Sequence, residues 1–161
     1  MCSSDLAALP YVLGQLPVDD EAARTLCASY WTPRPQLALG QALRGLAGAA
    51  QDISDGLLAD ATHIARASGV ALEIDLEQLP LSPALLACLP LEEARQCALA
   101  GGDDYRLLFT LAPEHLQPLR EQGFEIRPLG RVRAGQGVSL LDGEGRPLPL
   151  PAGGYEHFAR T

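Results

Sequence analysis

Two carboxylates, a hydroxyl and a glycine lie close together between Asp52 and Gly56, after a run of small apolar residues. From Leu57 onward apolar residues recur at helical spacing, so the polar cluster falls where a strand turns into a helix. The first amides of such a helix have no partner within it and carry the positive end of its dipole. An anion could bind there, with Asp52 and Asp55 recruiting magnesium to neutralise it.

The same cluster also has a purely structural interpretation. Ser54 and Asp55 are residue types that commonly cap helices, and Asp-Gly is a common turn pair. Taken alone, the motif is therefore typical of a helix cap and of a ligand site in about equal measure. The rest of the chain has to decide between them.

A second stretch, from Gly101 to Tyr105, repeats this character with paired glycines and the paired acids Asp103 and Asp104 before an apolar strand. Glycines let the backbone approach a ligand closely, and adjacent acids beside a buried strand need a cation, a donor or solvent. The alternative is a helix end followed by a solvated turn. If both stretches serve one site, they must converge on a common cleft.

The composition limits the classes of partner. The chain has 161 residues, 47% of them hydrophobic and 20% charged, which suits one globular domain with a core. A net charge of −8 argues against nucleic acid and against anionic lipid surfaces. No apolar run approaches the roughly 20 residues of a membrane span, and residues 1–5 do not resemble a signal peptide. We therefore expect no membrane partner and a cytoplasmic location.

Cysteine and histidine offer no chemistry. The cysteines are scattered without C-x-x-C spacing, which favours thiols over a disulfide framework. They are Cys2, Cys27, Cys88 and Cys97. The histidines are too far apart to indicate a zinc site, and His63 is expected at an exposed or edge position of its helix.

The patterns predict a mixture of helices and strands. Helices are expected over 5–15, 19–30, 36–46, 55–68, 91–100 and 113–122; strands are expected leading into Asp52 and over 70–76, 105–111, 124–132 and 138–141. Pro80 and Pro83 mark an expected linker. The fold class predicted is α+β, a mixed β-sheet covered by α-helices, in a single domain over 1–161. Residues 1–48 form its mainly helical lead-in and 49–161 its α+β core.

An ordered set of motifs now gives a specific resemblance. The chain resembles the C-terminal half of thiamine-monophosphate kinase, in the superfamily of aminoimidazole ribonucleotide synthetase and selenophosphate synthetase. The motifs, at family-like spacing, are Tyr30 with Pro33-Arg34-Pro35, Asp52-Ile53-Ser54-Asp55-Gly56-Leu57, Ala67-Ser68-Gly69-Val70, Gly101-Gly102-Asp103-Asp104-Tyr105 with Leu107-Leu108-Phe109, and Gly154-Tyr155-Glu156-His157-Phe158.

The resemblance implies direct phosphoryl transfer from ATP to thiamine monophosphate, with Mg²⁺ ions and no covalent phosphoenzyme. Carried over by position, Asp52 and Asp55 would bind Mg²⁺ and Ser54 would contact ATP. Asp103 stands where the family usually has a substrate-binding Glu, and Tyr155 where an aromatic residue packs on the substrate. An aromatic face suits a cationic thiazolium. No residue of the chain is assigned as catalytic in the strict sense.

The sequence departs from the family pattern at several points. Asp103 is shorter than Glu, Tyr155 is smaller than the usual Trp, and Gln36 replaces a frequent arginine. The family's N-terminal domain, which carries most of its Mg²⁺ and ATP ligands and its homodimer interface, has no counterpart in the sequence. We therefore expect the chain alone to be inactive. Two alternatives stay open: another ATP-dependent enzyme of the superfamily, and a non-catalytic binding module.

Overall fold

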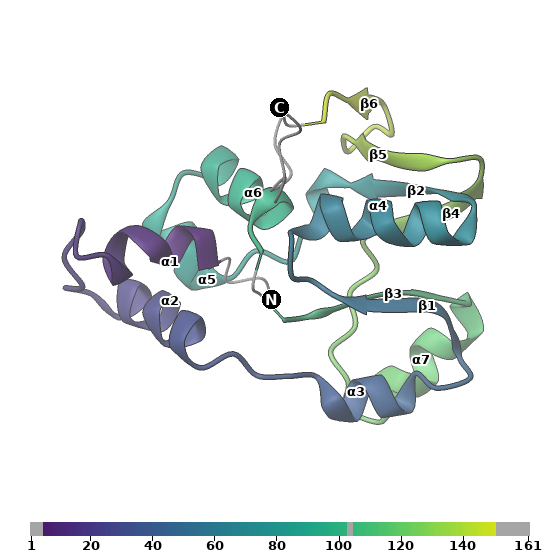
Figure 1. The fold of residues 1–161 in the computed structure, drawn as a ribbon, viewed down its shortest axis with the longest axis horizontal. Coiled ribbons are helices and arrows are strands. Elements are labelled where there is room, and N and C mark those ends of the chain that lie inside the picture. Colours follow the sequence, from purple (N-terminus) through teal and green to yellow (C-terminus); the bar gives the residue numbers. More distant parts are fainter. Residues whose placement is uncertain (1–4, 103–104, 151–161) are drawn as a thin grey trace, which may run out of the picture.

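The computed structural model describes residues 5–102 and 105–150, and Figure 1 shows their arrangement. The elements, in chain order, are α1 (Asp5–Val12), α2 (Glu21–Trp31), α3 (Leu37–Ala42), β1 (Ala47–Asp52), α4 (Leu57–Ser68), β2 (Val70–Asp75), a 3₁₀ turn (Leu76–Gln78), α5 (Pro83–Cys88), α6 (Leu91–Ala100), β3 (Leu107–Leu111), α7 (Pro113–Glu121), β4 (Gly130–Ala134), β5 (Gly137–Leu141) and β6 (Pro147–Leu148).

The strands form two sheets. β1 and β3 pair antiparallel, with Asp52 opposite Leu107 at the end that leads to α4. The second sheet has the order β4-β2-β5-β6, in which β2 and β5 run parallel and the other neighbours antiparallel. The predicted α+β class with mixed strand directions is confirmed. Although α4 connects β1 to β2, these two strands belong to different sheets.

The helix α4 packs against both sheets and centres the core. Its buried face, which includes Leu57, Ala61 and Ile64, contacts Leu72 and Ile74 of β2. Partly buried residues of β1 and β3 pack on the same cluster. Burying the leucine and isoleucine side chains of this cluster contributes about 1.5–3 kcal/mol each, so the contact holds α4 against the sheets.

Two smaller clusters complete the packing. The helices α1, α2, α5 and α6 gather on one side around Leu26 and Leu85, neither of which is accessible to solvent. On another side, α3 and α7 pack near the sheet of β1 and β3, through residues such as Leu43 and Leu119. The helices expected at the start of the chain therefore pack against later helices.

Several element boundaries follow the sequence patterns closely. The helix predicted over 91–100 is α6, and α4 ends at Ser68 before Gly69, which adopts the left-handed conformation expected after a helix. The segment 32–35 is not helical, as its two prolines require. At the other end, α4 begins at Leu57, two residues later than predicted, because Gly56 has a φ of 109°.

Other predictions were wrong in detail. The expected linker around Pro83 contains α5, because Ser82 caps the helix by accepting a hydrogen bond from the Leu85 amide and Pro83 fits its first turn. The strand predicted over 124–132 begins only at Gly130, since Phe124 and Ile126 instead pack against the cluster of α3 and α7. The short β6 was not predicted.

The described residues also bear on the expectations about membrane spans and disulfides. Across residues 5–102 and 105–150, no helix has both the length and the apolar character that a membrane span needs. Among the described residues, no disulfide joins Cys27, Cys88 and Cys97 to one another. Cys2 lies outside the described residues.

Candidate active site

The first acidic junction lies where β1 runs into α4. Beyond the end of β1, the Ile53 amide donates to the Arg106 carbonyl at 2.8 Å, and the Tyr105 amide donates to the Ile53 carbonyl at 3.1 Å. These two bonds continue the pairing of β1 with β3 into the turn. The chain segment that follows Asp104 is thereby tied to the first junction.

Two glycines let the junctions approach one another closely. A methyl group on Gly102 would overlap the Ser54 carbonyl oxygen and lie 3.1 Å from its carbonyl carbon. On the other side, a methyl group on Gly56 would lie 2.9 Å from the Ala100 carbonyl oxygen. Backbone is therefore packed on backbone, which only glycine permits. The described parts of the two junctions lie side by side, as a common cleft requires.

The centre of the junction is held by an acid that the sequence patterns did not single out. Asp60, in the first turns of α4, has only 1% of its surface exposed. One carboxylate oxygen accepts the Ser54 amide at 3.0 Å and the Asp55 amide at 3.1 Å. The other accepts the side-chain amide of Gln51 at 2.6 Å. Asp60 thus satisfies the loop amides that we had expected an external anion to use.

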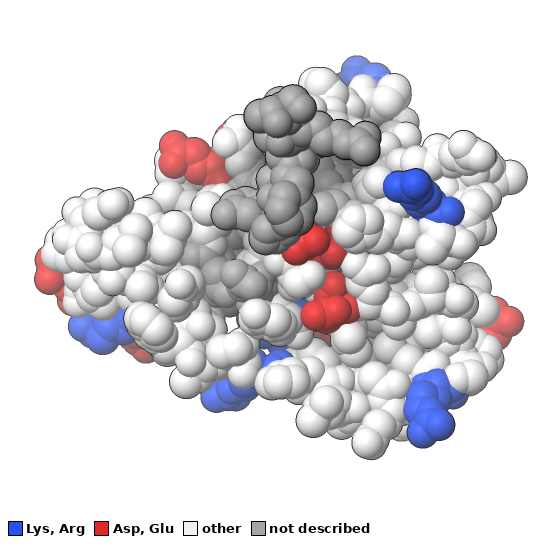
Figure 2. All heavy atoms as spheres, in the orientation of Figure 1, with Lys and Arg blue, Asp and Glu red and all other residues white. Residues whose placement is uncertain are grey.

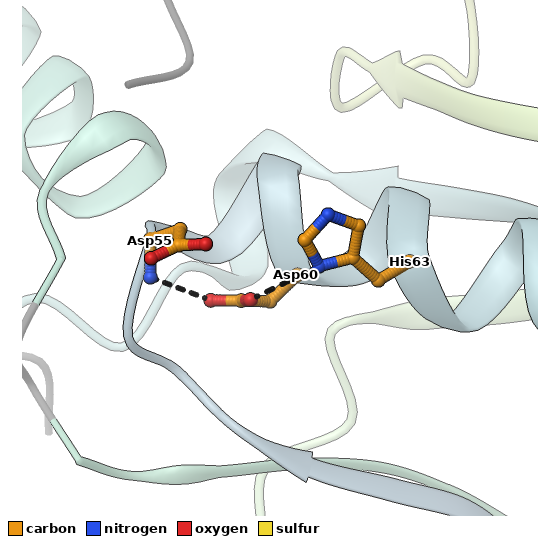
Figure 3. A group of neighbouring side chains, drawn as sticks. All are labelled: Asp55, Asp60 and His63. Carbon is orange, nitrogen blue, oxygen red and sulfur yellow. Dashed lines mark hydrogen bonds and ion pairs between the residues drawn. The ribbon is translucent and has the colours of Figure 1, made fainter. Parts of the chain in front are cut away.

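Figure 3 shows Asp55, Asp60 and His63 as one group. Each can offer a ligand atom within 4.8 Å of the others. His63 Nδ1 lies 3.6 Å from the Asp60 carboxylate, and the His63 side chain is 59% exposed, which confirms its expected exposed position on the helix. Asp52 is not in this group, although it ends the preceding strand.

The predicted site residues have different surroundings. Asp52 is exposed, whereas Ser54 and Asp55 are half-buried. Within the described residues, no donor contacts the carboxylate of Asp52 or that of Asp55. Figure 2 shows acidic side chains gathered near the middle of one face, over the region where β1 meets α4. Asp103 and Tyr155 lie outside the described residues.

The sequence contained a signal for Asp60 that the pattern analysis missed. The apolar stripe of α4 includes Leu57, Ala61 and Ile64, and Asp60 lies three residues after the first and four before the last. Residues at these spacings share one helix face. A carboxylate on a buried face needs hydrogen-bond donors, so its position alone indicates a partner in the adjoining loop.

Thiol chemistry is not favoured by the surroundings of Cys97 in α6. Burial, with a smaller contribution from nearby Glu93, raises the pKa of this thiol. A thiol with a raised pKa carries less of the nucleophilic thiolate at neutral pH. This agrees with assigning it no catalytic role.

A cavity of about 570 Å³ lies away from the first acidic junction. It runs between β3 and β4 beneath α4, and it is lined mainly by apolar side chains, including Ile64, Leu108 and Leu116. Asp52, Ser54 and Asp55 do not line it. This cavity is therefore separate from the described acids of the first junction.

The model of the family described as "AIR synthase related protein, C-terminal domain" matches residues 24–143. The chain belongs to this family. Its relatives at the sequence level include thiamine-monophosphate kinases, such as the Escherichia coli (strain K12) protein, which is 38% identical over 160 residues, covering 95% of this chain and 49% of that protein. The resemblance inferred from the motifs is confirmed.

Solved structures agree with this assignment. Thiamine-monophosphate kinase from Stenotrophomonas maltophilia K279a has a TM-score of 0.79 and 38% identity, covering 87% of this chain and 47% of that chain. AaThiL complexed with AMPPCP and TMP has a TM-score of 0.81 and 32% identity, covering 98% of this chain and 49% of that chain. The chain spans about half the length of the curated relatives it matches.

Proposed function

We propose that the chain is the C-terminal half of a thiamine-monophosphate kinase, which transfers a phosphoryl group from ATP to thiamine monophosphate and forms thiamine diphosphate. The observation that carries this proposal is the contact of the two glycine-flanked junctions, at which Gly102 lies on the backbone of Ser54. This contact places Gly102, the last described residue before Asp103, beside the loop that carries Ser54 and Asp55. The relative named as a complex with AMPPCP and TMP matches nearly the whole chain and supports the same substrates.

In this proposal each predicted site residue keeps its role. Asp52 and Asp55 bind Mg²⁺, Ser54 contacts ATP, and Asp103 and Tyr155 contact thiamine monophosphate. The exposed or half-buried positions of the first three support these roles. Because Asp60 occupies the loop amides of Ser54 and Asp55, phosphate is held through cations rather than through those amides.

The carboxylates of Asp52 and Asp55 suit a magnesium ion. Asp52 and Asp55 offer carboxylate oxygens with no described donor attached, and hard oxygen ligands are those that Mg²⁺ prefers. Bound Mg²⁺ would neutralise charge on the transferring phosphates. The protein's own contribution is to hold the acids and the substrates in line, without a covalent intermediate.

The proposal also covers the N-terminal half, the location and the partners of the complete enzyme. In this proposal the chain is one domain over 1–161, and an N-terminal half supplies further Mg²⁺ and ATP ligands and a homodimer interface. The match of this chain to about half the length of its relatives supports this division. The complete enzyme acts in the cytoplasm and binds neither nucleic acid nor membrane, in keeping with a net charge of −8.

The test compares the chain alone with a joined enzyme, in which this chain replaces the corresponding half of the Escherichia coli relative. Thiamine diphosphate formation from ATP and thiamine monophosphate is measured for both. We expect turnover by the joined enzyme and none by the chain alone, because two aspartates do not complete a metal cage. Robust turnover by the chain alone, or a folded joined enzyme without turnover, would contradict the proposal.

Two alternatives are tested alongside it. A panel of phosphate acceptors offered to the joined enzyme separates thiamine-monophosphate kinase from another ATP-dependent enzyme of the superfamily, which would prefer a different acceptor. A non-catalytic module would bind ligand without consuming ATP. We expect thiamine monophosphate to be the preferred acceptor.

A further inference from the structure

We propose that Asp60 is a positioning residue, whose buried carboxylate holds the Ser54–Asp55 backbone so that the Asp55 side chain faces the metal site. This inference rests on the proposed function for its consequence in catalysis. It assigns a role to a residue that neither the motifs nor the relatives' names single out.

The geometry of Asp60 supports a role beyond stabilising a helix end. Its carboxylate is 1% exposed and accepts three hydrogen bonds, at 2.6, 3.0 and 3.1 Å. Two come from consecutive loop amides and the third from Gln51 on β1. A single side chain therefore links the end of β1, the loop and α4. Because side chains in a helix lean toward its N-terminus, a residue four positions into α4 can reach back to this loop.

The charge of Asp60 also matters to its neighbour. Bonds to a charged carboxylate are about twice as strong as neutral ones, so the loop amides are held firmly in one direction. Figure 3 shows the Asp55 side chain next to Asp60, and a carboxylate oxygen of each residue lies within 4.8 Å of the other. Fixing the Asp55 amide on Asp60 therefore fixes where the Asp55 side chain starts and keeps its carboxylate close to that of Asp60.

The test substitutes Asp60→Asn, which keeps the shape but removes the charge and one acceptor oxygen. The control is Ser82→Ala, because Ser82 is the other buried polar residue of the described chain and caps α5 through the Leu85 amide. Both variants lose native hydrogen bonds, but only the first lies at the junction. A purely structural role predicts the same behaviour for both.

Three measurements are made on each variant. Amide hydrogen exchange in the chain is expected to speed up at Ser54 and Asp55 by at least about tenfold for Asp60→Asn, as loss of a charge-assisted bond implies. Mn²⁺ affinity of the joined enzyme, followed by electron paramagnetic resonance, is expected to fall about 10–100-fold, the usual effect of residues that orient metal ligands. The Mg²⁺ concentration that gives the half-maximal rate of thiamine diphosphate formation should rise by a similar factor.

Ser82→Ala should leave metal affinity and Mg²⁺ dependence unchanged. If Asp60→Asn lowers thermal stability as Ser82→Ala does but leaves Mn²⁺ affinity and loop exchange unaltered, the inference is wrong. Should the unmodified joined enzyme form no thiamine diphosphate, the proposed function fails. Exchange and Mn²⁺ binding would still decide the role of Asp60, because neither measurement requires turnover.

Discussion

The three acids at the junction of β1 and α4 have different surroundings, which separates their tasks. Asp60 is buried, and its oxygens accept the loop amides and Gln51. Asp52 is exposed, and Asp55, three residues further along the chain, is half-buried. Among the described residues, no hydrogen-bond donor contacts either carboxylate. A buried, fully bonded acid organises structure, whereas acids with unused oxygens can accept a cation.

At this scale the substitution Asp55→Asn tests the proposed metal site. The amide keeps the size of the side chain but removes its charge, so we expect the joined enzyme to lose about 100-fold or more in kcat/KM. Thiamine diphosphate formation at varied Mg²⁺ measures the effect. Asp19→Asn, an exposed acid outside both junctions, serves as the control and should retain normal activity. An equal loss of activity in both variants would show that the net negative charge of the chain, rather than the position of Asp55, determines activity.

At the scale of elements, the two junctions are brought together by strand pairing and by glycine. β1 and β3 pair along their lengths, and the bonds of Ile53 extend this pairing into both turns. Gly102 then lies directly on the Ser54 carbonyl. The relative position of the two acidic turns is therefore set by backbone contacts, which are less adjustable than contacts between flexible side chains.

The substitution Gly102→Ala should disturb this arrangement. The added methyl group meets backbone, so relief requires moving one junction from the other, at a cost of about 1–3 kcal/mol. Urea unfolding of the chain measures the loss. Gly40→Ala, within α3, is the matched control, because its added methyl group would lie at an ordinary contact distance of 3.7 Å from the side chain of Leu107. This control should be neutral or stabilise by about 0.5–1 kcal/mol. Equal stability of the two variants would contradict the close contact.

The turn between β5 and β6 gives a pH prediction. Asp142 accepts the amides of Glu144 and Arg146, both at 2.9 Å, and the Arg146 guanidinium at 2.7 Å. The hydrogen bonds from the Arg146 backbone and side chain hold the pKa of Asp142 below its usual value. A lowered folded pKa means that the acid stabilises the turn above its ordinary pKa, and that this contribution disappears as pH falls through the folded pKa.

The amides of Glu144 and Arg146 should therefore lose protection from hydrogen exchange in acid, below about pH 4. Nuclear magnetic resonance of the chain at a series of pH values, with intrinsic exchange rates corrected for, checks this. In Asp142→Asn the acid-dependent change should vanish. Glu114→Gln, at an exposed position of α7, should retain it. Persistence of the change in Asp142→Asn would assign it to another group.

For the whole molecule, local patterns gave the elements but not all of their partners. The stripe beginning at Leu57 and the glycine at position 69 predicted α4 nearly to its ends. The division of β1 and β2 between two sheets depends on which segments pair at long range, which no local pattern reports. Likewise the segment after Phe124 has a strand-like composition, but its side chains pack against α3 and α7.

In the candidate site, too, local features could be predicted from the sequence and long-range contacts could not. The two glycine-flanked acid pairs were visible in the sequence, since their chemistry is local. Their contact through Gly102 and Ser54 was expected only from shared function and required the three-dimensional structure. The apolar spacing of α4 did not predict the role of Asp60, because it marks the apolar residues of the buried face and says nothing of a buried acid among them.

The most direct measurement is the crystal structure of the joined enzyme with a non-hydrolysable ATP analogue, thiamine monophosphate and Mn²⁺ in place of Mg²⁺. We expect anomalous peaks for Mn²⁺ beside the carboxylates of Asp52 and Asp55, with the nucleotide phosphates against them. Metal and nucleotide bound elsewhere, with both carboxylates facing solvent alone, would contradict the claim that these junctions form one wall of a phosphoryl-transfer site.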